Sequence, residues 1–155
     1  MSAVSMIDQD ALADHKEFLT INISEQKFGI PVLQIQDVLG PQVITPIPLA
    51  PRGVAGALNL RGRIVTTLNV REILNFKKND STNRSMSVVV EHEQELYSLI
   101  IDSVGDVLAL ENSAYENNPP TLDPVLKDVS SGIYRLEKEL LVILDVPKLL
   151  ESVHN

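Results

Sequence analysis

Histidines and cysteines are the first side chains to consider for acid–base, nucleophilic or metal chemistry. The three histidines of this 155-residue chain are His15, His92 and His154, and no two of them have the spacing of a metal-ligand pair. The chain has no cysteine, which excludes disulfides, thiolate zinc sites and cysteine nucleophiles. It also lacks the P-loop and the glycine pattern of dinucleotide-binding folds. We therefore expect no enzyme, no catalytic residue, no metal and no cofactor.

Three carboxylates of the second half, Asp102, Asp106 and Glu111, could converge as an acidic cluster. Asp106, however, has a counterpart in Asp37 at the same place in an internal repeat. Recurrence in both halves favours a structural role over catalysis. An interaction surface is therefore a better hypothesis than an active site.

The charge distribution bears on the class of partner. The net charge of −8 argues against nucleic acid, because backbone phosphates are bound chiefly by lysine and arginine. Residues 52–84 nevertheless carry seven basic and two acidic side chains, a net charge of +5 within an acidic protein. This region is consistent with an acidic protein partner and equally with a solvated surface of mixed charge.

The sequence has no apolar run of signal-peptide or bilayer-spanning length. We therefore expect a cytoplasmic protein without direct membrane insertion.

The elements that would position a binding surface come from an internal repeat. Residues 27–39 match residues 96–108 at an offset of 69, and both segments end in Asp-Val-Leu. Residues 56–74 match residues 132–150 at an offset of 76. The second half thus holds seven extra residues, in a stretch rich in asparagine and proline that we expect to be a long surface connection.

Each repeat is predicted to be mostly strand. Period-two alternation predicts one hairpin over 18–32 and a second over 86–101. A short helix follows Asn69 in the first half and Asp145 in the second, since both residues are good N-caps before an i, i+3, i+4 apolar face. With 51 leucine, isoleucine and valine residues, two lobes of antiparallel strands curling into small barrels could share one core.

A proline-rich segment at 44–51 cannot be a central strand, because its three prolines lack backbone N–H donors. It is followed by Asn59 and Arg61, which the repeat places on Arg135 and Glu137. Residues that differ between the two copies are not needed to form a lobe. Asn59 and Arg61 are therefore candidates for function.

These patterns together resemble the CheW family of chemotaxis coupling proteins. The block Asn59-Leu60-Arg61-Gly62 after the proline segment is the most specific part of the resemblance. The other matching segments are 28–32, 35–39, 45–48, 69–71, 101–108, 119–120 and 141–146. The chain departs from the usual pattern at Thr66, at Asn69 and at Asp37, where proline, aspartate and glutamate respectively are common.

The resemblance implies a mainly β fold of two SH3-like five-stranded barrel lobes, packed as one intertwined domain with short helices. The domain would span residues 17–153 after a polar leader at 1–16. Lobe one would cover approximately 18–82 and lobe two approximately 83–150, and the terminal strands could be exchanged between the lobes.

The resemblance also implies a non-catalytic scaffold that couples transmembrane chemoreceptors to the histidine kinase CheA in bacterial chemotaxis signalling. Its partners would be the regulatory domain of the kinase and the cytoplasmic tips of methyl-accepting receptors. Two alternatives are an adaptor of another receptor–kinase pathway and a β-barrel that senses a small molecule.

The receptor site implied by the resemblance lies in a groove between the lobes. Its expected residues are Ile35, Asp37, Val38, Gly56, Asn59, Arg61 and Met86. The aliphatic members would form an apolar floor for a receptor helix, and the glycine would permit a close backbone approach. The arginine would offer planar donors to a receptor carboxylate or carbonyl, with Asp37 holding it in place. The sequence does not assign the kinase-binding residues.

Overall fold

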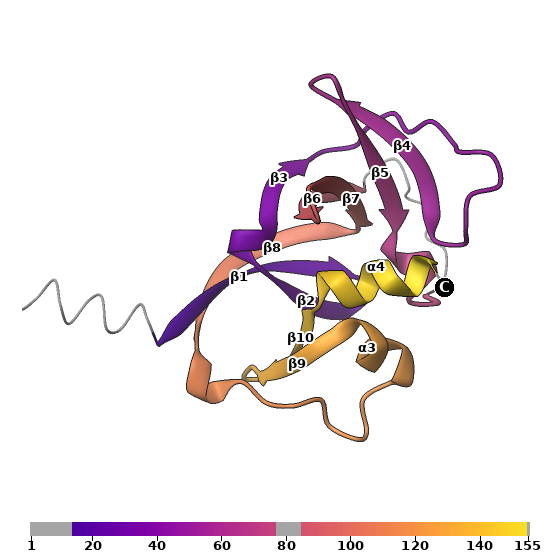
Figure 1. Ribbon diagram of the computed structural model, residues 1–155. Helices are drawn as coiled ribbons and strands as arrows, with labels where there is room; N and C mark the ends of the chain where they lie inside the picture. The colour runs from indigo at the N-terminus through magenta and orange to yellow at the C-terminus, as the bar shows by residue number, and fades with distance from the viewer. Residues whose placement is uncertain (1–13, 77–84, 155) are drawn as a thin grey trace, which may run out of the picture.

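The computed structural model describes residues 14–76 and 85–154, without the side chain of His154. Two five-stranded sheets form its framework, and short helices lie at their ends (Figure 1). The strands are β1 (His15–Ile23), β2 (Gln26–Pro31), β3 (Ile35–Leu39), β4 (Val54–Leu60), β5 (Arg63–Asn69), β6 (Met86–His92), β7 (Glu95–Ile101), β8 (Ser103–Glu111), β9 (Ser130–Arg135) and β10 (Leu140–Leu144). The helices are η1 (Val32–Gln34), α2 (Val70–Ile73), η3 (Asn112–Ala114), α3 (Pro124–Val129) and α4 (Val146–His154).

The two halves of the chain are intertwined. The first sheet, sheet A, has the order β8-β1-β2-β10-β9, and the second, sheet B, has the order β3-β6-β7-β5-β4. Each sheet thus combines a hairpin from one half of the chain with three strands from the other half. This arrangement confirms the mainly β fold of two five-stranded lobes in one intertwined domain.

The register of the strands confirms the internal repeat. In sheet B, Thr66 lies opposite Tyr97 in the parallel pair β5–β7. In sheet A, Val142 lies opposite Phe28 in the parallel pair β10–β2. Thr66 and Val142 are 76 residues apart, and Phe28 and Tyr97 are 69 residues apart, which are the two offsets of the repeat. The two sheets are therefore two copies of one pattern, with the same residues facing each other.

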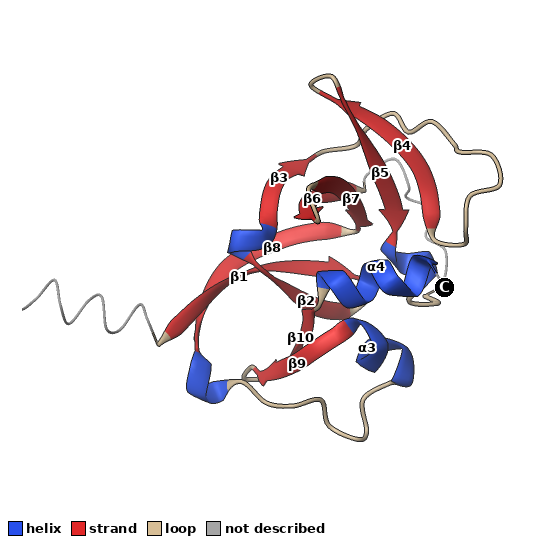
Figure 2. Cartoon of the chain, in the orientation of Figure 1, coloured by secondary structure: helices blue, strands red, loops and turns tan. Residues whose placement is uncertain are grey.

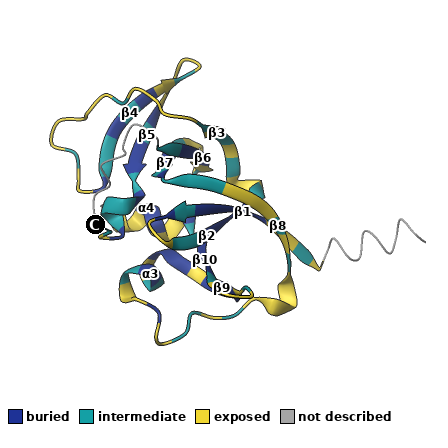
Figure 3. Cartoon of the chain, turned by 180° about the vertical axis from the view of Figure 1, so that it is seen from behind, coloured by how far each residue is buried: buried dark blue, intermediate teal, exposed yellow. Residues whose placement is uncertain are grey.

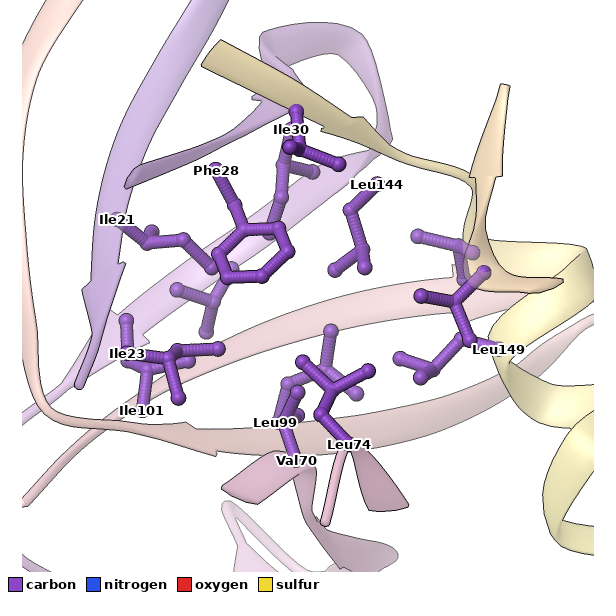
Figure 4. Close-up of a cluster of buried hydrophobic side chains, with 14 of the residues drawn as sticks. Ile21, Ile23, Phe28, Ile30, Val70, Leu74, Leu99, Ile101, Leu144 and Leu149 are labelled. Carbon is purple, nitrogen blue, oxygen red and sulfur yellow. The ribbon is translucent and has the colours of Figure 1, made fainter. Parts of the chain in front are cut away.

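The main core lies between the sheets (Figure 4). Phe28, Leu68, Leu99, Leu144 and Leu149 meet there, and all are almost completely removed from solvent. Complete burial of side chains of this kind stabilises a fold by about 1.5–3 kcal/mol each. The shared core makes neither lobe independent of the other.

The predicted helices after Asn69 and Asp145 are both present. Asn69 Oδ1 accepts a hydrogen bond from the Glu72 N–H at 3.3 Å, and Asp145 Oδ1 accepts one from the Lys148 N–H at 3.2 Å. Helix α4 buries Val146, Leu149, Leu150 and Val153, which lie on one face.

The expected long surface connection contains a helix that the repeat did not predict. Helix α3 begins with Pro124 after Asp123, whose Oδ1 accepts a hydrogen bond from the Val125 N–H at 2.9 Å. It buries Leu126 and Val129 and lies beside α4 (Figure 2).

Strand β8 is an edge of sheet A, and all its residues are exposed or half-buried (Figure 3).

Candidate functional site

Three of the seven predicted site residues lie on β3, one edge of sheet B. Ile35 is half-buried and packs against the main core, whereas Val38 has 38% of its surface exposed. Asp37 lies between them and accepts a hydrogen bond through Oδ1 from the Val38 N–H at 2.8 Å. This bond limits the rotation of the carboxylate and leaves its second oxygen available.

The other edge of sheet B is β4, which continues through a tight turn into β5. Arg61 and Gly62 are the central residues of the turn, and both have positive φ angles, 52° and 86°. This combination is typical of the type I′ turns that suit two-residue hairpins. Asn59 Oδ1 accepts a hydrogen bond from the Gly62 N–H at 2.9 Å. Asn59 therefore fixes the turn that presents Arg61.

An ion pair joins the two edges of sheet B. Arg61 Nη2 lies 3.2 Å from Asp37 Oδ2, although 80% of the arginine side chain and 27% of the aspartate side chain are exposed. Surface ion pairs of this kind contribute about 0–1 kcal/mol to stability. The pair therefore serves to place the guanidinium more than to stabilise the fold. Figure 1 shows β3 and β4 on opposite sides of sheet B.

Gly56 allows a close approach of another part of the same chain. A Cβ atom at this position would lie 2.3 Å from the Thr45 carbonyl oxygen. Thr45 and Ala57 exchange backbone hydrogen bonds of 2.8 and 2.9 Å, so the proline-rich connector pairs with the free edge of β4. The nearest backbone to Gly56 thus belongs to the connector, and an approach by a receptor remains a prediction.

Met86 is the first residue of β6, the strand that pairs with β3. Its side chain is half-buried and packs against the main core. All seven predicted residues therefore belong to sheet B and its β4–β5 turn. We call this set the β3–β4 seam: Ile35, Asp37, Val38, Gly56, Asn59, Arg61 and Met86.

Asp102 has a partner that the sequence analysis missed. Arg71 donates two hydrogen bonds to it, from Nε to Oδ1 at 2.9 Å and from Nη2 to Oδ2 at 2.6 Å. The Ser24 N–H donates a third, to Oδ2, at 2.7 Å. Burial alone would raise the pKa of Asp102, but the hydrogen bonds from Arg71 and Ser24 outweigh it and lower that pKa below its ordinary value.

The pair between Arg71 and Asp102 connects the two sheets, because Ser24 lies in the β1–β2 turn of sheet A and Arg71 follows β5 of sheet B. The repeat distinguishes each partner separately but not their pairing. At the stated offsets Arg71 falls on Pro147 and Asp102 falls on Leu33, so each partner occurs in only one half of the chain. Both partners belong to segments that had already been singled out, but nothing in the sequence connected them.

The other two carboxylates of the expected cluster lie elsewhere. Asp106 is exposed on β8, and Glu111 lies 3.8 Å from His15. Within residues 14–76 and 85–154, no group of three or more histidine, aspartate or glutamate side chains is placed to hold a metal ion. In the same part of the chain, no helix is long and apolar enough to cross a membrane.

Comparisons with known proteins agree with this architecture. The family model described as CheW-like domain matches residues 17–154. The chemotaxis protein CheW of Thermotoga maritima is 28% identical over 144 residues, which cover 93% of each chain. The chemotaxis protein CheW of Klebsiella aerogenes is 26% identical over 137 residues, which cover 88% of this chain and 82% of the relative.

A solved structure is similar in fold. The crystal structure of the scaffolding protein TtCheW from Thermoanaerobacter tengcongensis superposes with a TM-score of 0.76 at 24% identity. The match covers 84% of this chain and 88% of that one.

Proposed function

This chain belongs to the CheW-like domain family, and we propose that it joins the cytoplasmic tips of chemoreceptors to the histidine kinase CheA. A scaffold role in chemotaxis signalling follows from the family and from relatives named chemotaxis protein CheW that match along most of their length. The identity of the two partners, the absence of catalysis and the cytoplasmic location are parts of the proposal.

The β3–β4 seam is the proposed receptor site. A helix that docks on a protein needs an apolar floor and a few directing polar groups. Ile35 and Met86 pack against the core and can form a rigid apolar floor, and exposed Val38 extends this floor toward solvent. Arg61 offers the polar group, because its planar guanidinium can donate to a carboxylate or to a helix carbonyl.

The observation that carries this proposal is the placement of Arg61. Its turn is fixed by Asn59, and its guanidinium is oriented by Asp37, yet four-fifths of its side chain remains exposed. A cation that is held in position and still accessible is suited to recognition, since little side-chain entropy remains to be lost on binding.

Binding of a receptor-tip peptide by isothermal titration calorimetry tests the receptor site. Arg61→Glu should abolish measurable binding, because it removes the donors and places a carboxylate beside Asp37. Arg63→Glu is the matched control, since Arg63 is exposed two residues away and makes no ion pair with any described residue. Receptor binding by Arg61→Glu at wild-type strength would remove Arg61 from the site.

We propose a second surface for the kinase, formed by exposed aliphatic side chains beside the seam. Val43, Ile47 and Leu49 of the connector and Ile64 of β5 are accessible to solvent. The connector pairs with β4, so all four belong to the β4–β5 hairpin and the segment beside it. Leu49 is fully exposed, and its positive φ angle of 60° is unfavourable for a leucine. Transient assemblies use small interfaces with an apolar centre of this kind.

The kinase surface is tested by association with the purified regulatory domain of the kinase. We expect a dissociation constant of tens of micromolar or tighter, about −6 kcal/mol or below. The double variant Val43→Asp/Leu49→Asp should weaken this association and leave receptor-tip binding unchanged. Equal loss of both partners would instead indicate a folding defect, which circular dichroism would detect.

A further inference from the structure

A cavity of about 450 Å³ lies against sheet A, and its lining shares no residue with the β3–β4 seam or with the proposed kinase surface. Its lining includes Phe18 of β1, Tyr134 of β9 and Tyr115 of the segment after η3. Pro31 at the end of β2 and Pro147 in the first turn of α4 complete an apolar rim. Sites that hold small organic ligands typically have volumes of about 300–1,000 Å³. The cavity is therefore large enough for a ligand of one or two rings.

Aromatic rings form one wall of the cavity. The centroids of Phe18 and Tyr134 are 5.4 Å apart, and those of Tyr134 and Tyr115 are 5.7 Å apart, with the planes of both pairs steeply inclined. The Tyr115 hydroxyl donates to the Ser131 carbonyl, which fixes its ring. Three of the six aromatic residues of the chain thus gather at one place. Tyr115 is the accessible ring of this wall, since Phe18 and Tyr134 are almost completely buried behind it, and a planar aromatic ligand can meet Tyr115 by stacking or edge contacts.

Two donors at the cavity have no partner within the part of the chain that the structure describes. Tyr134 is only 3% exposed, and its hydroxyl makes no hydrogen bond to another described residue. Burial raises the pKa of this hydroxyl, so it stays protonated and able to donate at neutral pH. The buried side-chain oxygens without a partner in the described residues are Thr67 Oγ1 and Ser98 Oγ, so the Tyr134 oxygen still reaches solvent and is open to a ligand in the cavity.

The second donor is Lys16, whose ammonium group is exposed and makes no ion pair with a described residue. Asp145 is the carboxylate among the lining residues, and its Oδ1 already accepts from the Lys148 N–H at the start of α4. The two unused donors, the Tyr134 hydroxyl and the Lys16 ammonium, therefore favour a ligand that accepts hydrogen bonds, and Lys16 favours one with negative charge over the opposing effect of Asp145.

The positions of sheet B that the repeat makes equivalent to this region hold an ion pair. There the ion pair between Arg71 and Asp102 spans from α2 to the corner between β7 and β8. The offsets place Pro147 and Leu33 at these positions in the other lobe, and neither can form an ion pair. The lobe with the cavity thus lacks the polar link that its counterpart has.

From this juxtaposition we propose that the cavity binds a small planar aromatic acid. The ring lies against Phe18, Tyr115 and Tyr134. An oxygen atom of the acid group accepts from the Tyr134 hydroxyl, and Lys16 at the mouth balances the charge. This site shares no residue with either proposed docking surface.

Three indole probes of the same ring and different charge test the proposal on the full chain. They are indole-3-acetate, which is anionic, indole, which is neutral, and tryptamine, which is cationic. We expect saturable 1:1 binding of indole-3-acetate by calorimetry, with a dissociation constant of roughly 1 mM or tighter. Amide signals of β1, β9 and the residues around Tyr115 should shift in NMR spectra, while those of the β4–β5 turn stay in place.

Matched variants identify the two donors. Tyr134→Phe removes only the hydroxyl and should weaken indole-3-acetate binding roughly three- to tenfold. Lys16→Gln should weaken it about two- to fivefold and leave the binding of neutral indole unchanged. Tyr97→Phe is the control, since the Tyr97 hydroxyl donates to Glu95 in the other sheet.

The proposal is overturned if no probe shows saturable binding, if tryptamine binds more tightly than indole-3-acetate, or if both donor variants bind like the wild type. Loss of secondary structure in Tyr134→Phe would leave Lys16→Gln to decide. Receptor-tip and kinase binding, measured on the same variants, should be unchanged.

Discussion

Neutralising Asp102 tests whether the polar contact between the two sheets stabilises the fold. In Asp102→Asn the carboxylate charge is lost, while the shape of the side chain and one acceptor oxygen are kept. The side chains of Asp102 and Arg71 are only 25% and 17% exposed, so solvent replaces the lost interaction poorly. Hydrogen bonds to charged groups contribute about 1.5–3 kcal/mol. Because the pair is not fully buried, we expect a loss of about 1.5–2.5 kcal/mol in the free energy of unfolding at pH 7.

The pH dependence of this loss follows from the lowered pKa of Asp102. The folded chain holds this carboxylate at a lower pKa than the unfolded chain, where it is about 3.9. Its contribution to stability is therefore complete above the unfolded pKa and is lost as the pH falls through the folded pKa. The difference between wild type and Asp102→Asn should shrink below about pH 4 and vanish once the wild-type carboxyl is protonated.

Urea unfolding followed by circular dichroism, from pH 2.5 to pH 7, measures both effects. Asp37→Asn is the internal control, because its partner Arg61 is largely exposed and the change should cost no more than about 0.5 kcal/mol. A difference between wild type and Asp102→Asn that stays constant down to pH 2.5 would refute the assignment of this carboxylate. An equal effect of the two variants at pH 7 would show that burial does not set the strength of these pairs.

Three further substitutions have defined expectations. Leu68→Ala should destabilise the fold by about 2–5 kcal/mol in urea unfolding and weaken binding to both partners, since Leu68 is buried in the shared core. Gly56→Ala should lower the melting temperature and shift NMR signals of the connector, because the added Cβ would meet the Thr45 carbonyl oxygen; an unchanged connector spectrum would contradict this. Gln94→Gly should raise the free energy of unfolding by about 0.5–1 kcal/mol, because Gln94 and Glu93 both have positive φ angles in the β6–β7 turn; no change would mean that the turn is unstrained.

The fold could be predicted to the level of its repeating unit. The two offsets identified equivalent residues so well that Thr66–Tyr97 and Val142–Phe28 are register partners in their sheets. Self-similarity does not show which sheet a hairpin joins, because pairing within the hairpin is the same in either sheet. Exchange of β1–β2 and β6–β7 between the halves could therefore be anticipated only as a possibility, from the resemblance.

Helix α3 was missed for a different reason. Its segment lies in the insertion, where the repeat offers no comparison, and its prolines and asparagines favour a loop. The pair Asp123-Pro124 is nevertheless an N-cap followed by proline at the first helical position, and it precedes buried Leu126. The capping residues therefore indicated a helix, although the proline and asparagine content of the segment favoured a loop.

The functional residues were also predictable only in part. Comparison of the two halves singled out Asn59 and Arg61 as residues that the lobe does not need, and the structure gives Asn59 the local task of fixing the turn that presents Arg61. The partner of Asp102 was not predictable, because Arg71 is 31 residues away and only the exchange of strands brings them together.

The two arginine–aspartate pairs of this small protein show that burial, and not the residue types, determines the role of an ion pair. The Arg71–Asp102 pair lies at the junction of the sheets, where three hydrogen bonds satisfy the carboxylate and little of either side chain reaches solvent. The Arg61–Asp37 pair has a single contact at the rim, and most of the arginine is exposed. A partner can exchange the second pair for new contacts at almost no cost in stability, whereas breaking the first would loosen the junction between the lobes. An adaptor needs both kinds of contact, since a docking surface can be sensitive to its partner only if the framework that presents it stays fixed.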